Sequence, residues 1–371
     1  MRIGKNFLAF IAMQAAVTAA SAQSLSKAYG DYWRTGMSVN QWEVDSNQVS
    51  HFPIIANHFN WVVAENCMKM ESLQPSEGRF DFRKADAFVD KALAEGLQVV
   101  GHCLIWHSQC PAWFFKDKNG KDVTPEVLKK RMREHIRTIL GHFRGRVKAW
   151  DVVNEAFEDD GSLRQSKFYK ILGEDFIPLA FHYAHEADPS IELYYNDYSM
   201  NKASKVDGVV RFFKPLMAKG LSLTAIGLQG HMVLGSDDYV AQYEQSIKKI
   251  SQELGVPAQF TELDLSVLPN PYGFAGANIS DNFKYRKEMD PYRDGLPNSV
   301  ARKAEEFWID FYKMLIKNRE NILRVGFWCF NDANSWRNGF PIPGRTDYAT
   351  LFDRDSNPKP TIKKLVELVE K

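Results

Sequence analysis

The chain has 371 residues, of which 44% are apolar and 25% are charged, with 47 basic side chains against 46 acidic ones. This apolar share excludes an intrinsically disordered chain. A net charge near zero gives the whole protein no electrostatic reason to bind nucleic acid or an anionic membrane. Aromatic residues make up 13% of the chain, which suits either a large core or flat neutral ligands.

The first 22 residues predict a secretion signal peptide. Arg2 and Lys5 give it a positive start, an almost unbroken apolar run follows from Phe7 to Val17, and residues 20–22 form a small-residue cleavage site. The alternatives are a membrane anchor and a buried first helix, but the apolar run is too short to span a bilayer. We therefore expect a secreted mature chain, periplasmic or extracellular, that begins at residue 23.

Eight short apolar or β-branched runs alternate with stretches of helical period along the rest of the chain. The runs lie at 33–39, 59–64, 97–106, 147–153, 191–196, 225–229, 258–263 and 323–330, and helices are expected at 82–94, 124–140, 204–219, 237–254, 299–318 and 361–370. Such alternation is typical of βα units around a parallel sheet. Eight units without a linker between them predict an α/β fold, a single (β/α)8 TIM barrel over residues 23–371.

Two of the expected connections are long, at 266–298 after the seventh run and at 331–360 after the eighth. Long loops within a compact domain are usually functional. In a barrel they lie at the carboxyl-terminal face, where barrel enzymes place their active sites.

Four cysteines follow the signal segment: Cys67, Cys103, Cys110 and Cys329. They are too few for a disulfide-built scaffold, and their spacings match no zinc site. Cys103 and Cys110 flank the end of the third run, and we expect both to remain free buried thiols.

Two glutamates stand at the ends of expected strands. The fourth run ends in Asn154-Glu155, and the seventh carries Glu262 followed by Asp264. Two carboxyl groups that face each other across a barrel mouth are what glycosidic bond cleavage requires, because one protonates the leaving oxygen and the other attacks the anomeric carbon or activates water. A single glutamate at a strand end is most often only a solvated residue.

The neighbouring strand ends favour the functional interpretation. They carry polar and aromatic side chains that can hydrogen-bond hydroxyl groups and stack on rings. These residues are Glu65, Asn66, Lys69, His102, Trp106, His107, Gln109, Asn196, Asp197, Gln229, His231 and Trp328.

Six segments resemble glycoside hydrolase family 10, the endo-1,4-β-xylanases. They are Ala-Glu-Asn-Cys-Met-Lys at 64–69, His-Cys-Leu-Ile-Trp-His at 102–107, Trp-Asp-Val-Val-Asn-Glu at 150–155, Tyr-Asn-Asp-Tyr at 195–198, Gly-Leu-Gln-Gly-His at 227–231 and Thr-Glu-Leu-Asp at 261–264. The stretch from Trp328 to Arg337, with Asp332 and Trp336, extends the match. The resemblance covers essentially the whole mature chain in order.

The resemblance implies a retaining double displacement on internal bonds of xylan, with Glu155 as acid/base and Glu262 as nucleophile. It implies that Asn154 holds the sugar 2-hydroxyl and orients the nucleophile, and that His231 and Asp264 keep Glu262 ionised. It implies substrate contacts from Glu65, Asn66, Lys69, His102, Trp106, Gln109, Asn196, Gln229, Trp328 and Trp336. We expect xylan and xylo-oligosaccharides as partners, no metal or cofactor, and a monomer.

Some positions depart from the family pattern. Cys329 stands where Gly is expected, and Val63 stands where Thr is common. Phe330 and Asn331 complete an unusual turn, and we expect these departures together to alter the angle of Trp328 slightly. Four other tryptophans fall inside strand or helix patterns and are predicted to lie in the core: Trp33, Trp61, Trp150 and Trp308.

Three other functions stay open at this point. The nearest is the same mechanism on another β-1,4 glycan such as a glucan, because substrate choice depends on loops. A second is a metal-dependent barrel hydrolase that uses His102, His107 or His231. A third is a sugar-binding protein without catalytic activity, against which the presence of both glutamates argues.

Overall fold

The computed structural model describes residues 24–45, 51–271 and 282–370. The predicted signal peptide at 1–22 lies outside these ranges, as does part of the first long loop, at 272–281. Within them, no helix is both long enough and apolar enough to cross a membrane.

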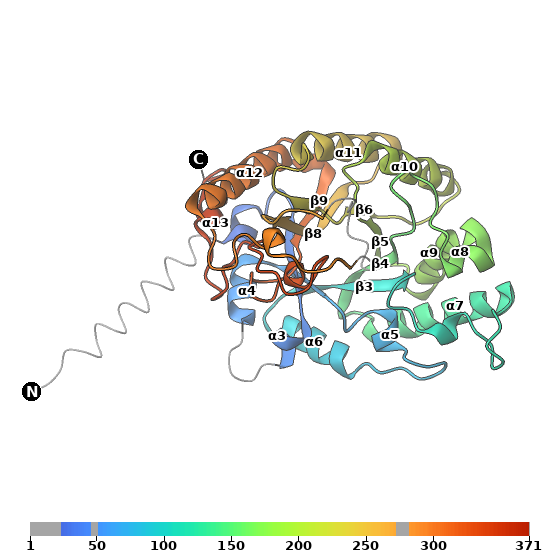
Figure 1. Ribbon diagram of the computed structural model, residues 1–371. Coiled ribbons are helices and arrows are strands. Elements are labelled where there is room, and N and C mark those ends of the chain that lie inside the picture. The colour runs from blue at the N-terminus through green and yellow to red at the C-terminus, as the bar shows by residue number, and fades with distance from the viewer. Residues whose placement is uncertain (1–23, 46–50, 272–281, 371) are drawn as a thin grey trace, which may run out of the picture.

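Eight parallel strands close into a barrel that helices surround (Figure 1). Strands β1 to β6 pair in chain order, β1 also pairs with β9, and β8 pairs with both β9 and β6, which closes the ring. This confirms the predicted (β/α)8 barrel. The strands are β1 (Arg34–Val39), β2 (Trp61–Ala64), β3 (Gln98–Trp106), β4 (Val147–Asn154), β5 (Glu192–Asp197), β6 (Ala225–Leu228), β8 (Ala258–Ser266) and β9 (Ile322–Phe327).

All six predicted helices are present. The residues at the amino terminus of one of them, which begins at Pro125, explain why it starts there. Thr124 accepts a hydrogen bond from the N–H of Val127 at 3.4 Å, and Pro125 occupies the first helical position. The helices between β4 and β5, where Pro178 and a run of apolar residues obscure the helical period, were not predicted, nor were four short helices within residues 25–73. The helices are α2 (Leu25–Ala28), α3 (Gln41–Asp45), α4 (Phe52–His58), α5 (Met70–Leu73), α6 (Arg83–Ala94), α7 (Pro125–Phe143), α8 (Lys167–Leu172), α9 (Phe176–Ala187), α10 (Ala203–Ala218), α11 (Tyr239–Leu254), α12 (Asn298–Lys317) and α13 (Pro360–Val366).

A short strand that the sequence analysis did not predict positions one residue of the barrel mouth. After β6 the chain turns at Gly230, whose φ is +80°, and β7 (His231–Val233) pairs with the outer half of β8, with His231 opposite Asp264. A Cβ atom at position 230 would lie 2.6 Å from a methyl carbon of Leu263. Only glycine therefore allows both this turn and this close approach.

Apolar side chains form two cores. The larger one joins the strands to the surrounding helices, and the smaller one fills the barrel interior with Trp61, Val63, Val100, Ala149, Tyr194, Ala225, Trp328 and Cys329. Trp33, Trp61, Trp150 and Trp308 are at most 9% exposed, which confirms their predicted place in the core.

The four cysteines all lie in described segments and are free thiols. This agrees with the expectation for Cys103 and Cys110. Cys103 is buried, but Cys110 is only partly buried, so the prediction of burial is wrong for Cys110. It lies in the loop just after β3.

Two helical glycines should respond in opposite ways to replacement by alanine. A Cβ at Gly208 in α10 would lie 2.2 Å from the carbonyl oxygen of Gly161, whereas a Cβ at Gly141 in α7 would meet nothing within 4 Å. Gly208→Ala should therefore lower the free energy of unfolding by about 1–3 kcal/mol. Gly141→Ala should raise it by about 0.5–1 kcal/mol, because alanine loses less backbone entropy.

Urea unfolding followed by circular dichroism measures both values. A Gly208→Ala variant as stable as the wild type would contradict the tight helix-to-loop packing that the structure shows at this position.

Candidate active site

A cavity of about 170 Å³ opens at the carboxyl ends of the barrel strands. It brings together residues that are far apart in the sequence but lie in or after the carboxyl-terminal parts of six barrel strands, with His231 from the start of β7. Asn196 and Asp264 lie directly behind this lining, hydrogen-bonded to residues within it. The lining residues are Glu65, Asn66, Lys69, His102, Trp106, Gln109, Asn154, Glu155, Gln229, His231, Glu262, Trp328 and Trp336.

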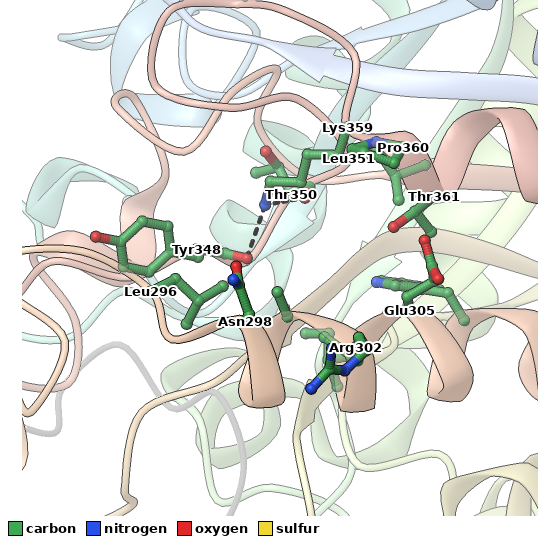
Figure 2. Close-up of a pocket in the computed structure, with 14 residues that line it drawn as sticks. Leu296, Asn298, Arg302, Glu305, Tyr348, Thr350, Leu351, Lys359, Pro360 and Thr361 are labelled. Carbon is green, nitrogen blue, oxygen red and sulfur yellow. Dashed lines mark hydrogen bonds between the residues drawn. The ribbon is translucent and has the colours of Figure 1, made fainter.

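A larger cavity of about 390 Å³ lies between α12, α13 and the loop that precedes α13 (Figure 2). Its lining is mainly apolar. Lys359 beside it donates hydrogen bonds to the carbonyl oxygens of Tyr348 and Thr350 and pairs with Asp332 at 2.7 Å. Because this charge is already matched, and because the predicted site residues line the other cavity, we place the functional site at the barrel mouth.

Glu155 follows the last residue of β4 and adopts φ = +57°, a left-handed conformation that is rare for residues other than glycine. Two contacts hold this backbone: the N–H of Glu155 donates to the carbonyl oxygen of Asn196 at 2.9 Å, and Arg164 Nε donates to the carbonyl oxygen of Glu155 at 3.0 Å. Its carboxyl group accepts hydrogen bonds from Trp106 Nε1 and Gln229 Nε2, each at 2.9 Å. The residue is 4% exposed.

Burial raises the pKa of Glu155, and the negative charge of Asp197 raises it further, while the two hydrogen bonds from Gln229 and Trp106 lower it only in part. Asp197 lies at the end of β5, accepts from the N–H of Phe157 at 3.3 Å and pairs with Lys205 Nζ at 2.8 Å. Glu155 therefore keeps its proton to a higher pH than an ordinary glutamate.

Glu262 in β8 has the opposite surroundings. Its carboxylate accepts hydrogen bonds from Asn196 Nδ2 at 2.8 Å and from His231 Nε2 at 3.2 Å. Burial alone would raise the pKa of Glu262, but the hydrogen bond and positive charge of His231, with smaller contributions from His102 and Asn196, lower it overall. Glu262 is therefore ionised where Glu155 is still protonated.

A buried series of alternating charges supports Glu262. His231 Nδ1 donates to Asp264 at 2.9 Å, and Asp264 also accepts from Arg337 Nη2 and Trp336 Nε1, each at 2.7 Å. Burial opposes the charge of His231, but Asp264 and Glu262 raise its pKa to about 9. Arg337 and His231 lower the pKa of Asp264 to about 2 despite its burial. The sequence analysis named Arg337 within a motif but gave it no role.

The amide that contacts Glu262 belongs to Asn196. The sequence analysis had expected Asn154 to orient the nucleophile. Asn154 and Asn196 are opposite each other on β4 and β5, and Asn196 Nδ2 donates to Asn154 Oδ1 at 3.0 Å as well as to Glu262. Thr261, which the sequence analysis named within a motif but gave no role, donates to Asn196 Oδ1 at 2.7 Å. The pairing of β8 with β9 shifts between Phe260 and Leu263, where Thr261 and Glu262 both approach Asn196.

One side of the cavity forms a polar cluster. Lys69 Nζ donates to Gln109 Oε1 at 2.8 Å and to Asn66 Oδ1 at 3.2 Å, and it lies 4.8 Å from the centre of the Trp106 ring. Burial lowers the pKa of Lys69. His102 Nδ1 pairs with Asp151 at 2.9 Å. This arrangement presents amide and ammonium groups beside aromatic faces, which suits a hydroxylated ring.

The family model described as Glycosyl hydrolase family 10 matches residues 22–368. The chain belongs to glycosyl hydrolase family 10. It is 43% identical over 363 residues to "Endo-1,4-beta-xylanase A" of Xylanibacter ruminicola, and the match covers 98% of each chain. No group of three or more His, Cys, Asp or Glu side chains that could hold a metal ion occurs within the described segments of this family 10 chain.

Solved structures of family 10 proteins are similar over nearly the whole barrel. An endoxylanase retrieved from a sugarcane soil metagenome has a TM-score of 0.90 at 38% identity, over 93% of this chain and 100% of that one. The intracellular xylanase of Thermoanaerobacterium saccharolyticum, solved as a mutant with xylotriose, has a TM-score of 0.79 at 33% identity, over 92% of this chain and 98% of that one.

The charge of Asp197 should be measurable at Glu155. Asp197→Asn keeps the size of the side chain but removes its negative charge, so the pKa of Glu155 should fall. Titration of the Glu155 carboxyl carbon by nuclear magnetic resonance measures this directly. The matched control, Asp160→Asn in an exposed loop, should leave the Glu155 pKa unchanged; an unchanged pKa in Asp197→Asn would refute the proposed influence of Asp197.

Proposed function

We propose that the protein is a retaining endo-1,4-β-xylanase that hydrolyses internal β-1,4-xylosidic bonds of xylan and xylo-oligosaccharides. One observation carries the proposal: Glu155 and Glu262 are buried in the same cavity, with the pKa of the first raised and that of the second lowered. Glycosidases with two carboxyl groups need one protonated and one ionised at the same pH. Family membership and the similarity to named xylanases support xylan as the substrate.

In the first step Glu155 donates its proton to the glycosidic oxygen while Glu262 attacks the anomeric carbon. The bond between that carbon and the leaving oxygen breaks, the leaving sugar departs with a new hydroxyl group, and an ester forms between Glu262 and the remaining sugar. Retention by this route calls for carboxyl groups about 5–5.5 Å apart. Activity should fall as the pH drops through the pKa of Glu262 and as it rises through that of Glu155.

In the second step Glu155 acts as a base. The ester on Glu262 carries no negative charge, so the pKa of Glu155 falls and its carboxylate can accept a proton from water. The oxygen of that water attacks the anomeric carbon, the ester bond breaks, and Glu262 is released as a carboxylate. Two inversions give a product with the configuration of the substrate.

The surrounding residues have separate tasks in this proposal. Asn196 and His231 hold Glu262 in the orientation for attack, and Asn154 at the cavity surface binds the 2-hydroxyl of the sugar, a contact that strengthens in the transition state. Trp328 and Trp336 border the sugar at the cleavage point. Their bulk leaves little room for a 6-hydroxymethyl group and so favours xylose over glucose.

A second cavity supports cleavage within a chain. It has a volume of about 180 Å³ and shares His231 with the catalytic cavity, so a polysaccharide that fills the catalytic cavity can extend into it. Its other lining residues are Ser199, Asn201, Lys202, Val233, Ser236, Asp237, Tyr239, Asn270 and Arg337.

Product analysis on three polysaccharides tests the substrate. The protein should release short xylo-oligosaccharides from xylan early in the reaction, with much slower release of reducing ends from glucomannan and cellulose. Faster cleavage of cellulose than of xylan would show that the mechanism acts on a glucan, and no release from any of the three would refute hydrolysis altogether.

Removal of each carboxyl group should change the activity in a different way. Glu155→Ala should lose about 10²–10⁴-fold on xylan but little on aryl xylosides with good leaving groups, which need no proton donation. Glu262→Ala should lose turnover on both substrates, and azide should partly restore it with inverted product. Equal losses for both variants on both substrates would contradict the assigned roles.

We also propose that the protein is exported and that residues 1–22 are removed. The basic start, apolar run and Ala20-Ser21-Ala22 support this. Amino-terminal sequencing of protein recovered outside the cytoplasm should begin at Gln23, whereas an amino terminus at Met1 would refute it.

A further inference from the structure

Cys329 keeps a side chain at a backbone conformation that favours glycine. Its φ is +69°, in the left-handed region, and the resemblance to family 10 leads us to expect Gly at this position. A glycine would adopt this conformation without strain, so the thiol group calls for an explanation of its own.

The thiol joins two parts of the catalytic cavity. Its Sγ donates a hydrogen bond to Glu65 Oε1 at 3.0 Å and accepts one from the N–H of Trp336 at 3.4 Å. The backbone N–H of Cys329 donates to Ser38 Oγ at 2.7 Å, and Ser38 Oγ lies 3.5 Å from the same Glu65 oxygen. Cys329 is 2% exposed, and burial raises its pKa, so the thiol remains a protonated donor at neutral pH.

These hydrogen bonds leave one oxygen of Glu65 for substrate. Both contacts to its carboxyl group use Oε1, while Glu65 lines the cavity next to Asn66 and Lys69. A carboxyl group held at one oxygen presents the other in a defined direction. Without the thiol, Oε1 would keep only the long contact to Ser38.

Glu65 follows β2, which lies opposite β6 in the ring, whereas Asn196 and Gln229, which hold the two catalytic glutamates, lie at the carboxyl ends of β5 and β6. We propose that Cys329 is a positioning residue that fixes Glu65 for binding of a sugar beyond the one at the cleavage point. The proposal rests on the function proposed above and adds a residue that determines affinity for longer chains. Cys329 itself touches no substrate. It acts through Glu65, so its effect should grow with the number of sugars bound on that side of the cavity.

Three variants separate positioning from folding. Cys329→Ala and Cys329→Gly remove the thiol, and Cys329→Ser keeps a hydrogen-bond donor. Cys329→Gly also removes the backbone strain, which offsets part of the packing lost with the buried thiol, and circular dichroism at the assay temperature should show a folded protein. A loss of affinity in this variant therefore does not arise from unfolding.

Kinetics on two aryl glycosides test the proposal. On an aryl β-xylotrioside, Cys329→Ala and Cys329→Gly should raise KM by about 5–10-fold with kcat within about twofold, as expected for one lost hydrogen bond. On an aryl β-xyloside, which carries a single sugar, KM should stay within about twofold of the wild type. Cys329→Ser should restore most of the affinity for the trioside.

Each remaining outcome has a definite meaning. Unchanged KM values for the trioside in active Ala and Gly variants would overturn this inference alone, and so would equal losses on both substrates. A wild-type protein that cleaves neither glycoside would overturn the inference together with the proposed function.

Discussion

The central constraint on this structure is the burial of two carboxyl groups in one small cavity. Burial raises the pKa of each, and their mutual repulsion adds to the cost of ionising both. The surroundings stabilise the ionised form of the two carboxyl groups to different degrees. Glu262 has a cationic imidazole and an amide as donors, whereas Glu155 has an indole and an amide as donors and the anionic Asp197 nearby. Hydrogen bonds of similar length thus accompany a lowered pKa at Glu262 and a raised pKa at Glu155.

The ion pairs behind Glu262 show how a buried charge is kept. Arg337, Asp264, His231 and Glu262 follow one another with alternating sign, and each interior member touches an opposite charge. A buried charge is tolerated when it is paired and hydrogen-bonded in this way. Asp264 comes from the outer part of β8, and Arg337 comes from the long loop after β9. This loop therefore supports the catalytic centre as well as bordering it.

Much of the fold and the identity of the lining residues follow from local sequence patterns. Alternating runs predict the barrel, and the rule that barrel enzymes carry their chemistry at the carboxyl ends of strands leads to Glu155, Glu262 and the residues around them. The partners of these residues are harder to predict. Asn196 reaches Glu262 because the pairing of β8 with β9 shifts between Phe260 and Leu263, and His231 does so because Gly230 starts the short strand β7. Neither register nor loop path is visible in a one-dimensional pattern.

Attack of Glu262 at the anomeric carbon is the central step of the proposed reaction, and the configuration of the first product tests it most directly. Proton nuclear magnetic resonance during the first minutes of xylo-oligosaccharide hydrolysis distinguishes the two anomers before they equilibrate. Retention predicts that the β-anomer appears first and the α-anomer follows by mutarotation. Initial formation of the α-anomer would contradict the account, because it would require direct attack by water and no covalent intermediate on Glu262.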